Sequence, residues 1–476
     1  MLAIGGLLKT LDAVTAAFDQ LLGADPGRCA VIHGEHRATR QDLDALARGF
    51  TPALVAAGAE GAIVGLMAAN GPGFLAGLLA LRRLGACVLM LDASMPRAEA
   101  ERVATAMGAV ALARCVAAWP ADATALEVAL LGAVRQAPAG AAFLKLTSGS
   151  TGAARAVAAS TDQVLSDDTN LHAAIGLGEG ERIVVGIPLS HAYGFCIGTI
   201  PALVRGATLI VPADRSPLAL AVEAAHHEAT LLPAAPAWIA AITQHADRLQ
   251  WPASVTRVVS ASALLPADVA TRFRERFGLS PQVLYGASET GAICVDTRGA
   301  AAERGTVGAP LPGVSVTLVP RVPGGDAVVH VRSASVGLGY FPEPDERLGC
   351  GSFITSDLGV FRGNELALIG RDDHVMNVRG RKVQPAAIEA VVAMMPGVAE
   401  VAAVGIPTGT GEGDRVRVIV VSHGSEVTAA HVLDWCRARL AGHEVPRSVL
   451  FVSALPRTDR GKLDRACLMQ LAEDPR

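Results

Sequence analysis

Short apolar runs recur along the chain, and Ala-rich stretches with helical periodicity separate those in the first 140 residues. This alternation of strand-like and helical segments is typical of βαβ units on a mainly parallel sheet. In the middle of the chain each run ends in a turn that contains Pro, Gly or Ser. The predicted fold class is therefore α/β. The runs lie at residues 62–67, 87–91, 110–113, 182–187, 208–211 and 255–260.

The pattern changes between about residues 306 and 331, where β runs alternate with Gly and Pro and predict a smaller, more antiparallel β subdomain. The polar segment Gly370-Arg371-Asp372-Asp373 predicts a turn and is the best candidate for a domain boundary. We predict a large N-terminal domain over residues 1–370, a hinge at 371–373, and a small mobile α+β domain over 374–476. The expected strands lie at 314–319, 327–331, 366–369, 400–405 and 416–421, and the expected helices at 385–394 and 428–440.

Composition limits the possible locations and partners. A net charge of -4 and a pI near 6.3 provide no basic footprint for nucleic acid. Residues 61–81 form an uncharged run, but Asn70, Gly71, Pro72 and Gly73 interrupt it, which predicts strand, loop and buried helix rather than a membrane span. The eight cysteines contain no CxxC pair, and residues 1–11 lack the features of a signal peptide. The expected location is the cytoplasm.

A loop of Gly and hydroxyl residues follows the β run at residues 144–146. Such a loop can present backbone N–H groups and hydroxyls to phosphate oxygens. It is not a Walker loop, because GxxxxGK(S/T) is absent. A plain Ser/Gly turn is the alternative on this segment alone. The loop residues are Thr147, Ser148, Gly149, Ser150, Thr151 and Gly152.

This loop resembles the phosphate loop (S/T)SG(S/T)TGxPKG of the adenylate-forming superfamily, which contains acyl-CoA ligases, nonribosomal adenylation domains and luciferases. The sequence departs from that pattern at Ala154, Arg155 and Ala156, which replace Pro, Lys and Gly. The chain contains only four lysines, so Arg155 fits a general replacement of Lys by Arg, with the charge kept and the geometry changed.

Further family motifs follow in order. Residues 188–195 resemble the loop whose histidine borders the acyl pocket, and residues 285–290 resemble the YGxTE segment. The resemblance implies that the Tyr285 ring packs on adenine, that Gly286 belongs to the nucleotide site, that Ser288 faces phosphate, and that Glu289 with Thr151 holds Mg²⁺. One or two carboxylates beside phosphate oxygens is the usual Mg²⁺ arrangement.

The last motifs resemble the ribose, hinge and catalytic-lysine segments of the same family. The resemblance implies that Asp357 accepts hydrogen bonds from the ribose hydroxyls, that Arg371 touches ribose and phosphate, and that Asp372 and Asp373 form the hinge. Residues 455–465 closely resemble the C-terminal PxTxxGKxxR loop, so Lys462 is the expected catalytic lysine. His191 and Arg371 are its expected catalytic partners. Ser356 and Asn377 replace family residues.

The resemblance implies an ATP- and Mg²⁺-dependent ligase that forms an acyl-AMP and passes the acyl group to a phosphopantetheine thiol, on CoA or on an acyl carrier protein. The predicted pocket segments contain no charged side chain that would receive an ammonium or a second carboxylate. We therefore expect an uncharged monocarboxylic acid, with a small aromatic, hydroxybenzoate-like acid preferred over a short or medium fatty acid. A degraded, non-catalytic paralogue is the alternative from another class. The expected acyl-pocket residues are His191, Tyr193, Ser260, Ser262, Ala287 and Ala292.

Overall fold

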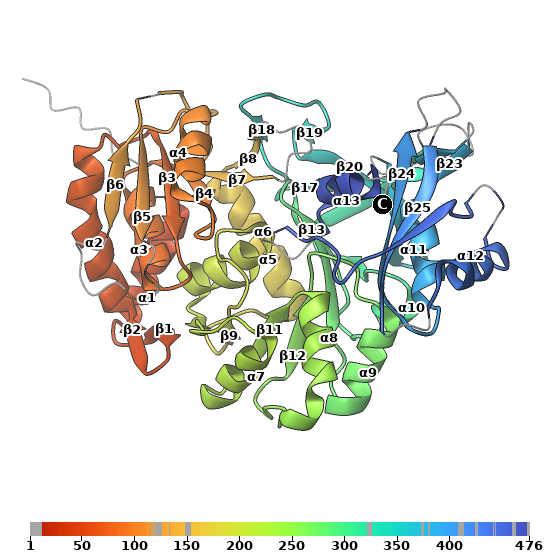
Figure 1. Ribbon diagram of the computed structural model, residues 1–476. Helices are drawn as coiled ribbons and strands as arrows, with labels where there is room; N and C mark the ends of the chain where they lie inside the picture. The colour runs from red at the N-terminus through yellow and green to blue at the C-terminus, as the bar shows by residue number, and fades with distance from the viewer. Residues whose placement is uncertain are drawn as a thin grey trace, which may run out of the picture. The chain divides into compact units, whose positions relative to one another are not determined.

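The computed structural model describes residues 12–115, 117, 119, 126–132, 134–147, 154–320, 326–372, 376–378, 381–407, 414–423, 427–440, 442, 444–458 and 463–473. Contacts within the chain define two units (Figure 1). The first contains Met1–Val316 and Val331–Phe353, and the second contains Thr317–His330 and Ile354–Arg476.

A seven-stranded sheet forms one layer of the first unit, with the order β18-β8-β7-β4-β3-β5-β6. Strand β3 pairs in parallel with β4 and β5, and β4 pairs in parallel with β7. Every residue of β3 and β4 is buried, as expected for parallel strands covered on both faces. The strands are β3 (Ile63–Ala68), β4 (Cys87–Leu91), β5 (Ala111–Cys115), β6 (Glu127–Leu130), β7 (Phe143–Leu146), β8 (Ala156–Ala159) and β18 (Gly339–Phe341).

A nine-stranded sheet forms a second layer of this unit, with the order β15-β14-β13-β12-β11-β9-β10-β1-β2. The strands from β13 to β1 pair in parallel, so their carboxyl ends share one edge. In open sheets of this kind ligands bind at that edge. The strands are β1 (Cys29–His33), β2 (His36–Thr39), β9 (Arg182–Val184), β10 (Thr208–Ile210), β11 (Leu231–Ala234), β12 (Arg257–Ser260), β13 (Gln282–Ala287), β14 (Gly291–Val295) and β15 (Ala309–Pro310).

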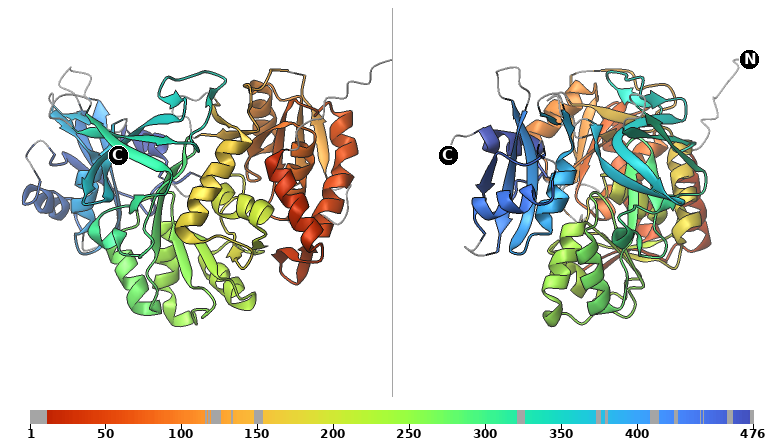
Figure 2. Two further views of the ribbon diagram at one scale, coloured as in Figure 1. Left: turned by 180° about the vertical axis from the view of Figure 1, so that it is seen from behind. Right: turned by 90° about the vertical axis from the view of Figure 1, so that its right-hand side faces the viewer.

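Helix α5 (Thr161–Ile175) runs between the two sheets, as Figure 1 and the left view of Figure 2 both show. Ser160 and Gln163 form a capping box at its start, and Gly176 ends it with a left-handed φ of 67°. The other helices of this unit are α1 (Ala13–Ala24), α2 (Arg40–Ala56), α3 (Pro72–Arg83), α4 (Arg97–Ala106), α6 (Ala192–Gly194), α7 (Pro217–His226), α8 (Pro236–Gln244), α9 (Ala267–Phe277) and α10 (Ala301–Arg304), with the π-helical turns η2 (Phe195–Thr199) and η3 (Pro201–Arg205) and the 3₁₀ turn η4 (Ala246–Arg248).

Residues 61–81 form a strand, a loop and a buried helix, as predicted, because Pro72 begins α3. Among the described residues, no helix combines the length and the apolar character that crossing a bilayer requires.

The second unit is built on antiparallel β structure and a three-stranded sheet in the order β24-β25-β26. Alternate residues of β25 face opposite sides of that sheet. Val418 and Val420 pack in one apolar cluster with Val383 and Ile388, whereas Ile419 packs in a second cluster with Leu468 and others. The elements are β20 (Ser352–Arg362), β21 (Glu365–Arg371), β22 (Met376–Val378), β23 (Arg381–Val383), β24 (Val398–Pro407), β25 (Asp414–Ser422), β26 (Ser448–Phe451), α11 (Pro385–Ala393), α12 (Ala429–Arg437) and α13 (Arg465–Glu473).

A five-stranded sheet lies where the division between the units crosses the chain. Its order is β16-β17-β20-β19, and β21 pairs with β20. The remaining strands are β16 (Val314–Pro320), β17 (Ala327–Ser333) and β19 (Leu348–Gly349).

The predicted turn at residues 370–373 is wrong in its first half. Gly370 and Arg371 belong to β21, where Arg371 pairs with Asp357 on β20. The long strand β20 pairs with these two residues, and the polar sequence of the segment gives no sign of that pairing. The α/β fold class, with a larger N-terminal part and a smaller C-terminal part, is confirmed. The hinge at 371–373 stays a prediction.

Candidate active site

His191 lies beside a carboxylate that no motif marked. Asp92 directly follows β4, and His191 lies in the loop after β9, with its Nε2 2.6 Å from Asp92 Oδ2. The backbone N–H and hydroxyl of Ser94 each donate to Asp92 Oδ1 at 2.8 Å. Burial by itself would raise the pKa of Asp92, but the contacts with His191 and Ser94 outweigh it and hold that pKa below its usual range. The structure thus anchors the predicted pocket histidine.

The lowered pKa of Asp92 predicts that this carboxylate contributes a pH-dependent amount to the free energy of unfolding. The unfolded carboxyl has a pKa near 3.9, so the contribution of Asp92 should be complete above about pH 5 and should disappear as pH falls through the folded pKa. Asp92→Asn should lower the free energy of unfolding by about 2 kcal/mol at pH 7. Urea titrations at a series of pH values should also show a smaller loss of stability in acid for this variant than for wild type. Asp214→Asn is the matched control, because Ser216 donates to Asp214 in the same way on an exposed loop without a histidine. Equal effects of both substitutions would contradict a special role for the His191 contact.

Buried Asn70 holds the backbone that leads to His191. Its side-chain amide donates to the carbonyls of Val185 and Ile187 at 3.0 and 2.7 Å, and its Oδ1 accepts from Leu189 N–H at 2.9 Å. Three hydrogen bonds satisfy most of what one amide can make. The loop is therefore fixed to the end of β3, which Asn70 follows.

The phosphate-loop motif lies largely outside the described residues, which include Thr147 and Arg155 but not Ser148, Gly149, Ser150, Thr151 or Gly152. The ends of the loop meet, because Thr147 N–H donates to the Arg155 carbonyl at 3.0 Å and the Thr147 hydroxyl donates at 3.2 Å.

Arg155, at the family lysine position, is engaged by two neighbours. Its guanidinium pairs with Asp345 at 2.9 Å and lies over the Tyr340 ring, 3.5 Å from the centroid. The Tyr340 hydroxyl donates to Glu289 Oε1 at 2.7 Å. Burial and the Glu289 charge raise the pKa of Tyr340, so the phenol remains a donor. A continuous set of contacts therefore joins the base of the phosphate loop to the predicted magnesium ligand.

The Tyr285–Thr290 segment lies at the end of β13 and in the turn before β14. Tyr285 pairs with Cys294, and Ala287 pairs with Gly291. Gly286 packs so closely on β14 that an added Cβ would lie 2.5 Å from the Gly291 carbonyl oxygen. Ser288 and Glu289 occupy the turn. The structure thus brings Tyr285, Gly286, Ser288 and Glu289 together on one strand and turn.

The predicted pocket hydroxyls have three different environments. Tyr193 donates to the Val259 carbonyl at 2.7 Å, and burial raises its pKa well above the usual value, so it is a wall residue satisfied by backbone. Ser262 is exposed, with a φ of 76°. Ser260 is fully buried at the end of β12, and its hydroxyl has no hydrogen-bond partner in the described part of the chain. Ala287 is half-buried and Ala292 is buried.

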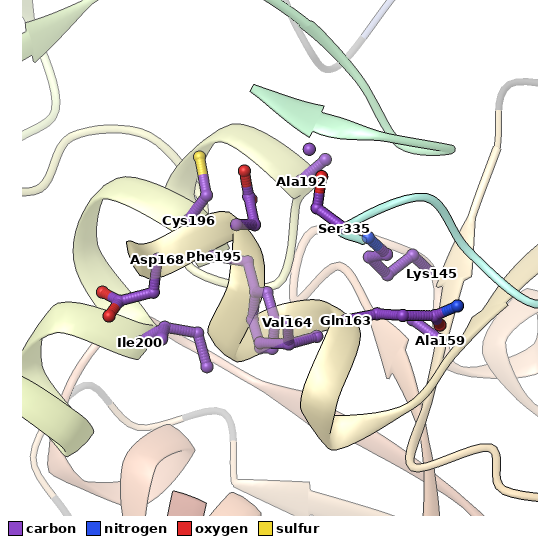
Figure 3. A pocket seen from close by; sticks show the side chains of 12 residues that line it. Lys145, Ala159, Gln163, Val164, Asp168, Ala192, Phe195, Cys196, Ile200 and Ser335 are labelled. Carbon is purple, nitrogen blue, oxygen red and sulfur yellow. The ribbon is translucent and has the colours of Figure 1, made fainter. Parts of the chain in front are cut away.

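A small cavity borders the predicted acyl-pocket segment and contains charged residues that no motif marked (Figure 3). Lys145 of β7 and Asp167 of α5 line it together with Ala192 and Cys196, which follow the predicted pocket residue His191 in the chain. The expectation of no charged side chain therefore holds for the sequence segments but not for their surroundings. Residues from β7 and α5 reach this region only because of the fold.

Asp357 and Arg371 lie together within the second unit. They face each other on β20 and β21, and Arg371 Nη1 is 3.0 Å from Asp357 Oδ1. A carboxylate and a guanidinium at this spacing provide both acceptors and donors for ribose and phosphate groups. Asp372 follows β21 in the described chain, and Asp373 lies outside the described residues.

Lys462 also lies outside the described residues, but the ends of its loop are described. Arg457 forms an antiparallel bridge with Leu463, and Asp464 N–H donates to the Pro456 carbonyl at 2.9 Å. Arg457 also pairs with Glu400 of β24. The lysine loop is therefore closed at its base and attached to the three-stranded sheet.

Comparison with known proteins identifies the family. The model of the AMP-binding enzyme family matches residues 18–341, and that of the AMP-binding enzyme C-terminal domain matches residues 387–462. The chain belongs to the AMP-binding enzyme family, within the adenylate-forming superfamily.

Individual relatives agree with this identification. The chain is 27% identical to an octahydroindenyl-propanoyl:CoA ligase of Mycobacterium tuberculosis over 98% of this chain and 100% of that protein. It is 30% identical to a feruloyl-CoA synthase of Amycolatopsis over 67% of this chain and 68% of that protein. It shares the fold of ATP-bound MatB from Rhodopseudomonas palustris, with a TM-score of 0.84, 24% identity, and coverage of 97% and 99% of the two chains. The predicted class, an AMP-forming acid–thiol ligase, is confirmed.

Glu289 has the chemistry expected of a Mg²⁺ ligand. It is a half-buried carboxylate in a turn, and one such carboxylate with phosphate oxygens and water suits Mg²⁺. Its Oε1 accepts the Tyr340 hydrogen bond, so the carboxylate would be held in place to bind the ion. No group of three or more metal-binding side chains occurs among the described residues.

Proposed function

We propose that this protein activates a small aromatic monocarboxylic acid as its acyl-AMP and transfers the acyl group to the thiol of CoA. The contacts from Arg155 through Tyr340 to Glu289 carry the proposal, because they connect the base of the phosphate loop with the turn expected to bind Mg²⁺. The aromatic preference is supported by the feruloyl-CoA synthase relationship.

In the first half-reaction a carboxylate oxygen of the acid attacks the α-phosphorus of ATP in line, and the bond to pyrophosphate breaks. Both reactants are anionic, so charge neutralisation is the main catalytic task. No general base is required, because the acid is already ionised near neutral pH. Lys462 supplies a compact positive charge between the carboxylate and the α-phosphate. Glu289, with phosphate oxygens, would hold Mg²⁺, and the bound ion would supply further positive charge at the pyrophosphate.

In the second half-reaction the CoA sulfur attacks the acyl carbon, the bond to AMP breaks, and the thiol proton is released. The family resemblance implies that the small domain rotates about residues 371–373 between the halves and withdraws Lys462. Such a hinge switch lets one site perform two reactions in turn.

Product analysis tests this function. With ATP, Mg²⁺ and CoA, mass spectrometry should detect one acyl-CoA and one AMP per acid consumed from a panel of benzoates, cinnamates and C4–C10 fatty acids. Aromatic acids should give the highest turnover. Turnover restricted to fatty acids would contradict the aromatic assignment. Product formed on a phosphopantetheinylated carrier protein but never on CoA would contradict the acceptor.

A further inference from the structure

The cavity shown in Figure 3 contains a buried cation and a buried carboxylate that the mechanism above does not use. Lys145 and Asp167 are each only 8% exposed. Charged side chains are rarely buried this deeply unless they are paired or functional. The same cavity is lined by Ala192 and Cys196, neighbours of His191 and Tyr193 in the predicted acyl-pocket segment.

Asp167 is held in place by β14. Its Oδ1 accepts from Ala292 N–H at 2.8 Å, and it packs on Gly291, whose φ is +74°. A Cβ on Gly291 would lie 2.2 Å from the Asp167 carboxyl carbon, so only glycine allows this approach. Burial raises the pKa of Asp167 to about 6, against the opposing effects of Ala292 N–H and Lys145. The carboxylate is therefore positioned at the start of β14, beside Ala292 of the predicted acyl pocket.

Lys145 has no hydrogen-bond or ion-pair partner among the described residues. Burial lowers its pKa, and the charge of Asp167 opposes that shift. A buried amine without a partner loses the solvation it would have in water. Asp168, the next residue on α5, pairs through Oδ2 with Arg205 at 2.7 Å, while its Oδ1 has no hydrogen-bond partner among the described residues. Lys145 is the cation that lines this cavity without a polar partner of its own among the described residues.

The size of the cavity limits what that partner is. The centre of a water-sized sphere can occupy about 10 Å³ of it, which is room for about one water-sized group. A second carboxylate is larger and would meet Asp167, whereas a methyl or chloro group would leave Lys145 without a partner. A hydroxyl has the right size and both accepts and donates a hydrogen bond. The predicted pocket hydroxyls are less suitable partners for a substrate hydroxyl in this cavity. Tyr193 is already bonded to backbone, Ser262 is exposed, and Ser260 does not line the cavity.

We propose that this cavity is a subsite for a hydroxyl substituent on the acyl group, with Lys145 donating to the hydroxyl oxygen and Asp167 accepting its proton. The proposal rests on the function proposed above and narrows its substrate to hydroxylated acids. Lys145 and Asp167 are specificity-determining residues in this account.

The test compares each hydroxylated acid with the same acid lacking the hydroxyl and with its methyl and chloro analogues. Acid-dependent ATP–pyrophosphate exchange gives kcat/KM for each. Wild-type protein should prefer at least one hydroxylated acid over its parent by at least about 100-fold, because the parent acid leaves the buried polar groups of the site unpaired. Lys145→Met and Asp167→Asn should reduce that preference to below about five-fold while changing kcat/KM for the parent acid little. The preference is a ratio, so it is unaffected by a reduced folded fraction.

Asp168→Asn is the matched control, because Asp168 lines the same cavity but already pairs with Arg205. It should lower the melting temperature and leave the preference unchanged. A wild-type protein without preference for any hydroxylated acid, or equal losses for hydroxylated and parent acids in both variants, would overturn the subsite. If no acid supports exchange, the proposed function fails; calorimetric binding then decides the subsite, since wild type must still bind a hydroxylated acid more tightly than its parent.

Discussion

Lys462→Ala should reduce acid-dependent adenylate formation by about 1000-fold, the size of loss seen when a preorganised charge or donor is removed from a transition state. Thioester formation from a preformed acyl-AMP should fall less than about three-fold, because the lysine is withdrawn in that half-reaction. The two rates are measured separately by rapid-mix quench, with ATP plus acid in one experiment and synthetic acyl-AMP plus CoA in the other.

Lys462→Arg is the companion variant. It keeps the charge but replaces a compact ammonium with a planar guanidinium, so it should recover part of the adenylation rate. Equal losses in both half-reactions for Lys462→Ala would refute the assigned role, since a lysine needed only for folding of the small domain would affect both.

Glu289→Gln should lower kcat/KM for pyrophosphate exchange by about 100-fold and raise the Mg²⁺ concentration required for half-maximal rate, because a neutral amide is a poor Mg²⁺ ligand. Thioester formation from preformed acyl-AMP should change little, since pyrophosphate has already left. A Mg²⁺ titration of the exchange rate provides the measurement.

Two variants separate metal binding from the hydrogen-bond network around Glu289. Tyr340→Phe removes the donor to Glu289 Oε1 and keeps the carboxylate, so the loss should be only a few-fold. Glu343→Gln removes an exposed carboxylate of the same unit and should have no effect. An unchanged Mg²⁺ requirement in Glu289→Gln would exclude this residue as the metal ligand.

The sequence predicts the parallel strands well, because a strand buried on both faces is a nearly continuous apolar run. The run at residues 87–91 coincides with β4, and the run at 62–67 differs from β3 by one residue at each end. Local sequence does not predict Gly370 and Arg371 as strand residues, because their strand character comes from pairing with β20.

Residues of the candidate site can be predicted from the sequence where they belong to a motif. They cannot be predicted where only packing of the fold brings them together. Tyr285 and Glu289 follow from the order of the motifs. Asp92 is a single carboxylate after an apolar strand, and its proximity to His191 depends on two loops 99 residues apart in the chain. Lys145 lies inside a run that predicts a strand, and only the packing of α5 against β14 brings Asp167 to the same cavity.

Acid-dependent ATP–pyrophosphate exchange is the most direct measurement of adenylate-forming activity. Purified protein with ATP, Mg²⁺ and labelled pyrophosphate should incorporate label into ATP only when a suitable acid is present, with hydroxylated aromatic acids most effective and Lys462→Ala inactive. A protein that binds ATP but gives no exchange with any aromatic or aliphatic acid would contradict catalysis and identify a nucleotide-binding paralogue that has lost it.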